Sequence, residues 1–264
     1  MTRNFNFQMK SLKSICINYT INNIAEIVKL NREGLAYLPN NVKDRLLSKF
    51  TVSSHFWRNV NLKKILSLLV HQNVKHIDLT CIVVDDEILE IIEKCSELSD
   101  LTLMYVGVHS LTSKGLVKFF SKMHKLSIVK ASHCDAIDDN VCNILFENNP
   151  NLIGLDIGGC FKVTDKSLVK LSNMNKLGCL NLSETKITNA GLEQVVKGSS
   201  GKNLVELRIS SCPNLTENVL KSVTENCNSL QILIFSNNQL DQFGENLESD
   251  KLKNLKQLTW TISW

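Results

Sequence analysis

Apolar residues recur along this chain in the pattern Leu-x-x-Leu-x-Leu, which returns eight times at a spacing of 24 to 28 residues. The copies begin at Val74, Leu98, Leu126, Leu152, Leu177, Leu204, Leu230 and Leu255. Self-similarity at a fixed period indicates stacked structural repeats, none of which buries its apolar face alone. The pattern therefore divides the chain into an N-terminal segment, residues 1–70, and a repeat array, residues 74–264.

The fourth and sixth positions of every copy are apolar, which predicts a short strand with these side chains facing inward. The pairs are Ile77/Leu79, Leu101/Leu103, Val129/Ala131, Leu155/Ile157, Leu180/Leu182, Leu207/Ile209, Leu233/Phe235 and Leu258/Trp260. An alternation of apolar and polar residues this short could arise by chance in one copy. Its repetition in phase along the chain makes chance an implausible explanation. In the last copy, Trp260 and Trp264 are expected to close the far end of the core, because a terminal repeat has no neighbour to cover it.

A second apolar set with helical spacing follows each strand, as in residues 163–171 and 215–223. Thr164, Thr188 and Thr216 suit N-cap positions, and Asp165, Asn189 and Glu217 follow them in the first turn. One strand and one helix per copy predict an α/β fold. We expect a right-handed leucine-rich-repeat solenoid, a horseshoe with a parallel concave sheet and convex helices.

The composition favours a folded protein that binds neither nucleic acid nor membrane. Hydrophobic residues make up 43% of the chain, and no run of eighteen uncharged apolar residues occurs. The net charge of +4 comes from 30 basic and 26 acidic residues that are interleaved, without the basic stripe that phosphate binding needs. Residues 1–10 lack a signal-peptide core, and the odd number of cysteines forms no compact extracellular framework, so we expect a cytoplasmic or nuclear protein. We also expect it to be monomeric outside its complexes.

The nine cysteines are interpreted as structural and reduced. Cys134, Cys160 and Cys212 occupy the ninth position of their copies, and no Cys-x-x-Cys pair indicates a metal site. His133 precedes Cys134, but adjacent residues on a strand point to opposite sides and form no dyad. We therefore predict a protein that is not an enzyme and that has no catalytic residues, metal site or cofactor.

Two pairs of neighbouring acids are also interpreted as structural. Asp85-Asp86 and Asp138-Asp139 stand where convex helices are expected to begin. Acidic side chains in a first turn are favoured by the helix dipole, so these pairs need no acid–base role.

Positions three, five and seven of each copy should point out from the concave sheet and form the recognition surface. The candidate partner-binding residues are Asp78, Thr102, Lys130, Asp156, Asn181, Arg208 and Ile234 at position five, with Glu206 and Ile232 at position three. Gly154 and Gly158 are expected to open a shallow notch, and Ile232 with Ile234 to form an exposed apolar spot. This mixture suits a protein or peptide ligand.

The N-terminal segment contains two helical patterns. Leu12, Ile15 and Cys16 share one helix face. Pro39 suits a first helical position, after which Val42, Leu46 and Phe50 line one side while Lys43, Asp44 and Arg45 should face water. One interpretation is a helical cap over the first repeat, completed by Val28, Leu30, Leu62, Ile65 and Leu69.

The other interpretation is a docking box for a cullin ubiquitin ligase. Leu12 and Cys16 resemble the elongin-binding half of a SOCS-type box, and Leu35, Leu38, Pro39 and Val42 resemble its cullin-selecting half. An F-box also opens with Leu-Pro, here Leu38-Pro39, and Trp57-Arg58 fits its pattern. The candidate docking residues are Leu12, Cys16, Leu38, Pro39, Val42 and Leu46. The resemblance implies elongins B and C with a cullin, or a Skp1-type adaptor with its cullin, as partners.

Motifs along the whole chain resemble the family known as antagonist of mitotic exit network protein. They are the Leu-Pro-x-Asn-Val-Lys-Asp-Arg-Leu run at 38–46, Asp-Ile-Gly-Gly-Cys at 156–160 with Thr164-Asp165, and Leu-Lys-Gln-Leu-Thr-Trp-Thr at 255–261. This resemblance implies a non-enzymatic, cell-cycle-linked binding protein with a role in ubiquitin-dependent turnover. Two hypotheses follow: a substrate receptor of a cullin ligase, or a stoichiometric inhibitor that masks a signalling protein without recruiting a ligase.

Overall fold

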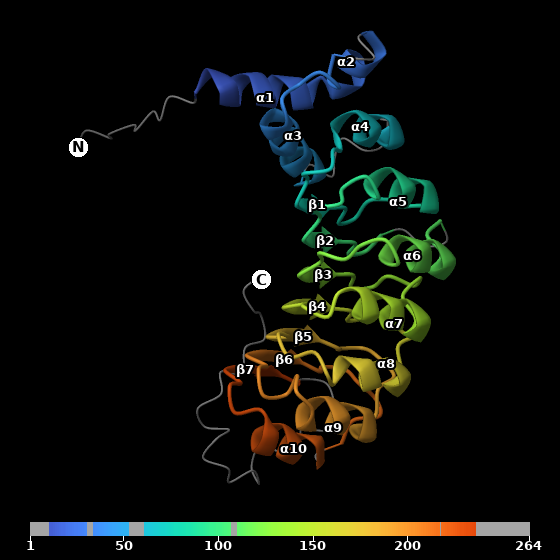
Figure 1. Ribbon diagram of the computed structural model, residues 1–264, viewed down its shortest axis with the longest axis vertical. Helices are drawn as coiled ribbons and strands as arrows, with labels where there is room; N and C mark the ends of the chain where they lie inside the picture. The colour runs from blue at the N-terminus through green and yellow to red at the C-terminus, as the bar shows by residue number, and fades with distance from the viewer. Residues whose placement is uncertain (1–10, 31–33, 53–60, 107–109, 217, 236–264) are drawn as a thin grey trace, which may run out of the picture.

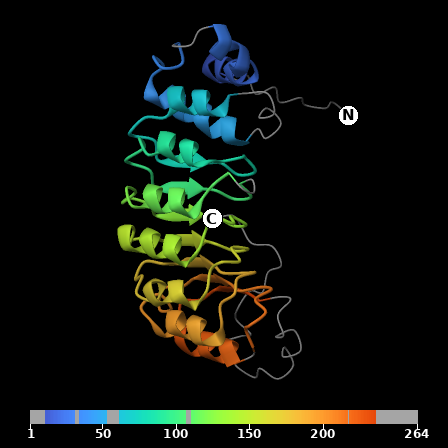
Figure 2. The same cartoon turned by 90° about the vertical axis from the view of Figure 1, so that its right-hand side faces the viewer.

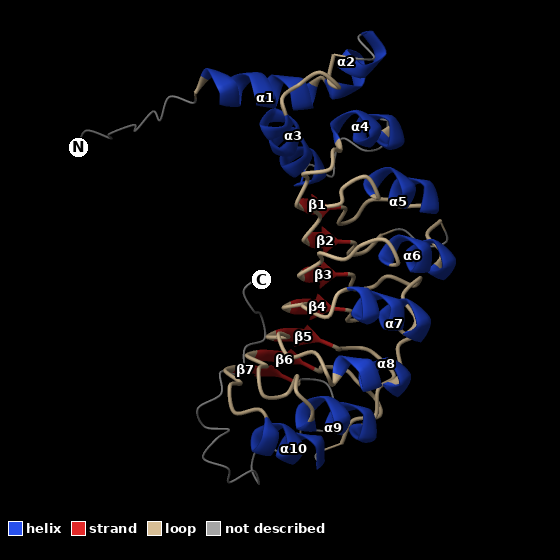
Figure 3. Cartoon of the chain, in the orientation of Figure 1, coloured by secondary structure: helices blue, strands red, loops and turns tan. Residues whose placement is uncertain are grey.

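The computed structural model describes residues 11–30, 34–52, 61–106, 110–216 and 218–235. They form a curved stack in which strands run along one side and helices along the other (Figure 1, Figure 3). Turned by 90°, the stack shows the helices of successive repeats one above another (Figure 2). The predicted α/β leucine-rich-repeat solenoid is confirmed.

The described strands form a parallel sheet in the order β1-β2-β3-β4-β5-β6-β7. Each has three residues: β1 (His76–Asp78), β2 (Asp100–Thr102), β3 (Ile128–Lys130), β4 (Gly154–Asp156), β5 (Cys179–Asn181), β6 (Glu206–Arg208) and β7 (Ile232–Ile234). Equivalent positions of neighbouring repeats are register partners, as in Ile77↔Leu101. Side chains at one position therefore form a row across the concave face.

The convex side consists of one helix per repeat. These helices are α5 (Asp86–Ile92), α6 (Ser113–Phe120), α7 (Asp139–Asn148), α8 (Asp165–Leu171), α9 (Asn189–Lys197) and α10 (Asn218–Asn226). Thr164 and Thr188 occupy N-cap positions as predicted, but only the Thr164 hydroxyl accepts a capping bond. Glu217 lies outside the described residues.

The core is a column of the predicted inward side chains. In the described repeats, positions four and six are at most 4% exposed, from Ile77 to Leu233, except for the partly exposed Phe235 beside the last described strand. Burial of this kind stabilises by about 25 cal/mol per Å² of apolar surface, and neighbouring repeats supply most of the cover. Leu258, Trp260 and Trp264 lie outside the described residues, so their predicted closing role stays a prediction.

Carboxylates at the helix N-termini connect successive repeats. The Asp139 carboxylate accepts a 2.8 Å bond from the Thr164 amide and a 2.6 Å bond from its hydroxyl. Asp165 binds Thr188 in the same way, at 2.8 and 2.6 Å. The predicted acidic pairs stand at helix starts as expected: Asp86 and Asp139 lie in the first turn, and Asp85 and Asp138 are N-caps. Asp86 accepts the Thr112 amide and hydroxyl, at 2.9 and 2.7 Å, as Asp139 accepts those of Thr164. The second residue of each pair therefore ties its helix to the next repeat.

Four helices precede the first strand: α1 (Leu12–Asn22), α2 (Ile24–Leu30), α3 (Asn40–Val52) and α4 (Leu62–Leu69). Helix α4 continues the convex row beside α5, and α3 lies against β1 (Figure 1). Val28, Ile65 and Leu69 are buried and Leu62 is partly buried, in agreement with the cap interpretation. Leu30 was wrongly assigned to the cap, since it is 87% exposed at the end of α2.

The start of α3 differs from the predicted arrangement. Pro39 directly precedes the helix, and its carbonyl accepts the amide hydrogens of Val42 and Lys43. The Lys43 side chain does not face water as predicted: it is 8% exposed, because its ammonium donates a 2.7 Å bond to the Ala36 carbonyl in the preceding turn. The side chain of Phe50 and the Trp57-Arg58 pair lie outside the described residues.

The Asn149→Ala variant should lose about 2 to 4 kcal/mol of unfolding free energy. Asn149 is 1% exposed, and its amide joins two repeats by accepting from the Leu126 amide at 2.9 Å and donating to the Met123 carbonyl at 2.8 Å. Truncation leaves these buried groups unpaired, which costs about 1 to 3 kcal/mol each. Urea denaturation measures the change.

The neighbouring Asn148→Ala variant is the matched control. Asn148 is partly buried and bonds only to the Ile144 carbonyl within its own helix, so its loss should cost less than about 1 kcal/mol. Equal stabilities of the two variants would contradict the inter-repeat role of Asn149.

Candidate protein-binding surfaces

The concave face carries the predicted partner-binding residues in two rows, but three of them are buried. Asp156 is 7%, Glu206 5% and Ile234 9% exposed. The prediction that these side chains are available to a partner is therefore wrong. Thr102, Lys130 and Ile232 are partly exposed, and Thr102 and Lys130 are register partners on adjacent strands.

Hydrogen bonds at the strand ends explain why Asp156 is not available. Its Oδ1 accepts the Gly158 amide at 3.0 Å and the Asn181 side-chain amide at 2.9 Å. Asn181 in turn accepts the Ser183 amide at 3.0 Å. A short polar side chain that binds the backbone two residues later ends the strand locally. In these two repeats the polar side chain at position five therefore ends its strand, so its role is not recognition alone.

The notch predicted at Gly154 and Gly158 is not found. A Cβ added to Gly158 would approach the Asn181 side-chain nitrogen to 2.8 Å, so Asn181 already occupies this space. Both glycines are buried.

Further along the face, Arg208 pairs with Glu206 two residues before it on the same strand. Arg208 is therefore engaged within the protein. Ile234 is 9% exposed and Ile232 is partly exposed, so the predicted exposed apolar spot is reduced to Ile232.

A row of left-handed residues borders the concave face where each strand turns. Cys81, Tyr105, His133, Gly159, Glu184 and Ser211 stand at position eight of successive described repeats, with φ between 53° and 71°. Tyr105 stacks on His133 with ring centroids 4.6 Å apart, and a Cβ at Gly159 would come within 2.3 Å of His133 Nδ1. His133 therefore packs along this row, and Cys134 is buried at 1% exposure. The sequence argument against a dyad placed both residues on a strand, but β3 ends at Lys130 and His133 has φ 54° in the turn after it.

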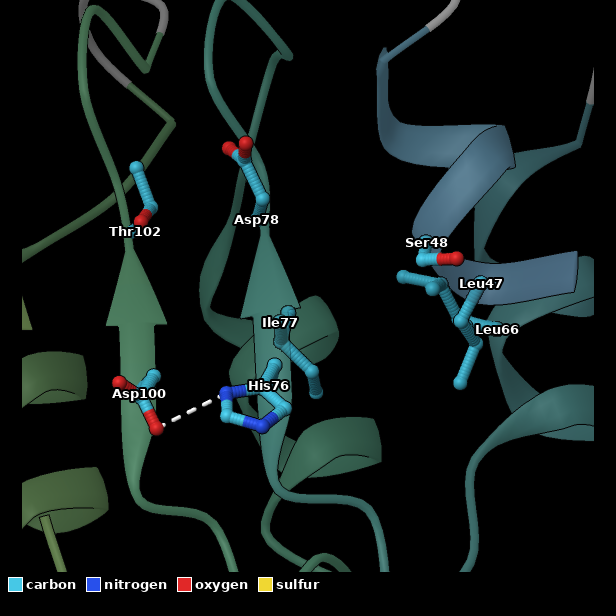
Figure 4. A pocket seen from close by; sticks show the side chains of 8 residues that line it. All are labelled: Leu47, Ser48, Leu66, His76, Ile77, Asp78, Asp100 and Thr102. Carbon is cyan, nitrogen blue, oxygen red and sulfur yellow. Dashed lines mark ion pairs between the residues drawn. The ribbon is translucent and has the colours of Figure 1, made fainter. Parts of the chain in front are cut away.

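A pocket lies where the concave face meets the N-terminal helices (Figure 4). Its volume is about 150 Å³. Helices α3 and α4 and strands β1 and β2 supply the lining residues Leu47, Ser48, Leu66, His76, Ile77, Asp78, Asp100 and Thr102. The sequence interpretation placed only Asp78 and Thr102 on a recognition surface. It missed the pocket because α3 and the strands are distant in sequence.

Helix α1 presents an apolar stripe to solvent. Leu12 is 76%, Ile15 52% and Tyr19 67% exposed, and Cys16 is exposed as well. These residues follow the i, i+3, i+4, i+7 spacing of one helix face. The opposite side of the helix is buried through Ile17 and Ile21. The stripe is hereafter the α1 stripe, Leu12, Ile15, Cys16 and Tyr19.

The predicted docking residues in and just before α3 differ in their exposure to solvent. Pro39 is exposed, while Leu38 and Val42 are partly buried against the core. Leu46 is 1% exposed and belongs to the core, so its assignment to a docking surface is wrong. Position 46 lies on the side of α3 that packs inward.

The buried cysteines are poor nucleophiles. Burial raises the pKa of the Cys95, Cys160 and Cys227 thiols to about 12. The Cys160 thiol donates to the Ala131 carbonyl of the preceding repeat at 3.2 Å. Thiol nucleophilicity requires the thiolate, so these side chains serve packing and hydrogen bonding.

Within the described ranges, no group of three or more His, Cys, Asp or Glu residues could hold a metal ion. None of the helices described here has the length and apolar character needed to cross a bilayer.

Taken together, the stacked parallel strands and convex helices define a leucine-rich-repeat protein. No protein-family model matches the chain. It is 29% identical over 158 residues to the DNA repair protein rhp7 of Schizosaccharomyces pombe, an alignment that covers 56% of this chain and 27% of that protein. The chain thus spans only about a quarter of this curated relative's length.

A crystal structure of the Rad7 and Elc1 complex in yeast aligns with a TM-score of 0.38 at 16% identity, covering 86% of this chain and 81% of that chain. These comparisons do not confirm the resemblance to the antagonist of mitotic exit network family.

Alkylation at pH 8 should separate the thiols into two groups. Cys16 and Cys81 are exposed and should react with iodoacetamide within minutes in the folded protein. Cys95, Cys160 and Cys227 should stay unmodified, because a thiol whose pKa is about 12 is protonated at this pH and is also inaccessible. Peptide mass spectrometry identifies the modified residues, and the guanidinium-unfolded chain, in which every thiol reacts, is the control. Rapid native labelling of Cys160 would refute its assigned burial.

Proposed function

We propose that this chain is a non-enzymatic adaptor that delivers a bound protein to a cullin-type ubiquitin ligase. In this proposal the α1 stripe docks on an elongin-type adaptor, and the concave sheet with its adjoining pocket captures the substrate. Catalysis belongs to the recruited conjugating enzyme. The adaptor acts by raising the effective concentration of substrate lysines near that enzyme.

The exposure of the α1 stripe is the observation that carries the proposal. A helix that served only as a cap would bury its apolar residues against the first repeat, whereas Leu12 is 76% and Ile15 52% exposed. Leu12 and Cys16 are the residues that resemble the elongin-binding half of a SOCS-type box. Amphipathic helices of this kind bind partners by laying anchors at i, i+3, i+4 and i+7 into a groove.

The cap and docking roles are compatible because they use different residues. Ile17 and Ile21 of α1 are buried, as are Leu46 and Leu47 of α3. They anchor the helices to the fold, and the α1 stripe stays on the outside. The alternative F-box mode shares Leu38 and Pro39 but gives no role to the exposed Leu12 and Cys16, so we favour the elongin-type partner.

Two cellular processes are proposed for this adaptor. The family resemblance suggests cell-cycle control at mitotic exit, and the similarity to a DNA repair protein suggests a nuclear role. We propose action in the nucleus or cytoplasm, on a substrate that the concave face selects. Purification from dividing cells with and without DNA damage distinguishes the two processes by the proteins recovered.

The Leu12→Ala, Cys16→Ala double variant should lose adaptor binding while remaining folded. Both side chains are exposed, so truncation should change the unfolding free energy by less than about 0.5 kcal/mol. Removing two anchors from a helix interface should weaken binding by more than about tenfold. Co-purification of elongins and a cullin with the tagged chain from cells measures the loss.

Lys13→Ala is the matched control, because Lys13 is exposed on α1 but lies outside the stripe. It should retain adaptor binding. Absence of elongins and cullin from both the wild type and Lys13→Ala would contradict the proposal. Recovery of the same signalling protein with all forms would then favour the inhibitor hypothesis.

A further inference from the structure

We propose that the pocket between α3 and the first two strands binds one apolar side chain of the captured protein, next to a lysine or arginine. This inference deepens the proposed function, since it specifies which peptide the substrate side recognises. The occupant is a segment of the bound protein with an apolar anchor and a basic neighbour.

The chemistry of the lining favours an apolar anchor. Leu47, Leu66 and Ile77 are at most 4% exposed and come from α3, α4 and β1. They form the apolar part of the lining, while Ser48, His76 and Thr102 add polar atoms around it (Figure 4). Apolar surface with a few placed polar groups is the usual composition of a binding site.

The volume of the pocket limits the size of the group that can bind in it. Small-molecule sites measure about 300 to 1,000 Å³. The pocket measures about 150 Å³, which is too little for a metabolite or cofactor. An apolar cavity of about 150 Å³ accommodates benzene, so one leucine, isoleucine or phenylalanine side chain is the matching group.

The charges of the lining favour a basic neighbour. The lining contains two carboxylates, Asp78 and Asp100, and neither lysine nor arginine. Asp78 accepts the Thr80 amide and hydroxyl on Oδ1 alone, at 2.9 and 2.6 Å. Oδ2 therefore keeps acceptor capacity for an incoming cation.

The second carboxylate is held in place across the sheet. His76 Nδ1 lies 2.8 Å from Asp100 Oδ2, between register partners on β1 and β2. Asp100 is thereby oriented before a ligand arrives. With Asp100 engaged by His76, the Asp78 carboxylate beside the apolar cavity is the charge that complements an apolar–basic dipeptide and opposes an apolar–acidic one.

Selection from a random dodecapeptide library on the full chain tests the inference. The selected peptides should be enriched in an aliphatic residue or phenylalanine adjacent to lysine or arginine. Fluorescence polarisation of a labelled selected peptide then compares variants. Ser48→Phe, which places a bulky group from exposed helix surface into the pocket, should weaken binding at least tenfold. Thr102→Phe should do the same from the strand side, which guards against a folding defect in either variant.

Asp78→Asn isolates the charge, because asparagine keeps the Oδ1 acceptor that Thr80 needs. It should weaken binding about three- to tenfold and reduce the salt dependence. Asp135→Asn, a neutralisation at an exposed loop residue outside the lining, is the matched control and should leave binding unchanged. Selected peptides without an apolar–basic pair, or equal affinity for wild type, Ser48→Phe and Thr102→Phe, would overturn the inference.

The Leu12→Ala, Cys16→Ala variant separates this inference from the proposed docking. Peptide binding that persists in this variant, while elongins are absent from the wild-type complex, would reject the ligase role and support the pocket. Loss of the predicted peptide preference with normal elongin binding would reject the pocket alone.

Discussion

Contact between successive repeats is the interaction on which this structure depends. Each described strand has three residues, and its inward side chains are buried by the repeats on either side. Polar groups reinforce the same contact: Asp139 and Asp165 bind threonines of the next repeat, and the Asn149 side-chain amide donates to the Met123 carbonyl of the preceding repeat. Stability is therefore the sum of nearest-neighbour terms, and each end needs a cover. At the N-terminal end, α3 and α4 provide that cover.

The same requirement determines which surfaces remain for partners. Polar side chains at outward strand positions bond within the fold, either to the next repeat or along their own strand. Asp156 and Asn181 bond to each other and to strand-end amides, and Glu206 pairs with Arg208 on the same strand. Exposed groups are left at the margins: the α1 stripe, the Tyr105–His133 stack, and the pocket at the junction of α3 with the sheet. Substrate capture and ligase docking are thus proposed at different places on one fold.

The N-terminal helices show how one amphipathic pattern can serve two purposes. Leu12 and Leu46 both belong to helical patterns with apolar spacing, yet Leu12 is 76% and Leu46 1% exposed. The sequence assigned both to docking because periodicity identifies a helix face without saying what covers it. Packing against the first repeat determines which of these residues is buried. Helix α3 lies against β1, whereas one face of α1 points away from the described fold (Figure 1).

The sequence by itself determined the repeat class, the position of every described strand, the inward columns and the helix starts at Asp85 and Asp138. These features follow from local periodicity and capping chemistry, which recur in phase and therefore reinforce one another. Only the tertiary structure decided that Asp156 and Lys43 are buried, that Asn181 fills the space at Gly158, and that Leu47 meets Ile77 and Asp100 around a pocket. The reason is physical: burial and hydrogen bonding of these groups depend on neighbours in other repeats or preceding turns, whose positions no local pattern specifies.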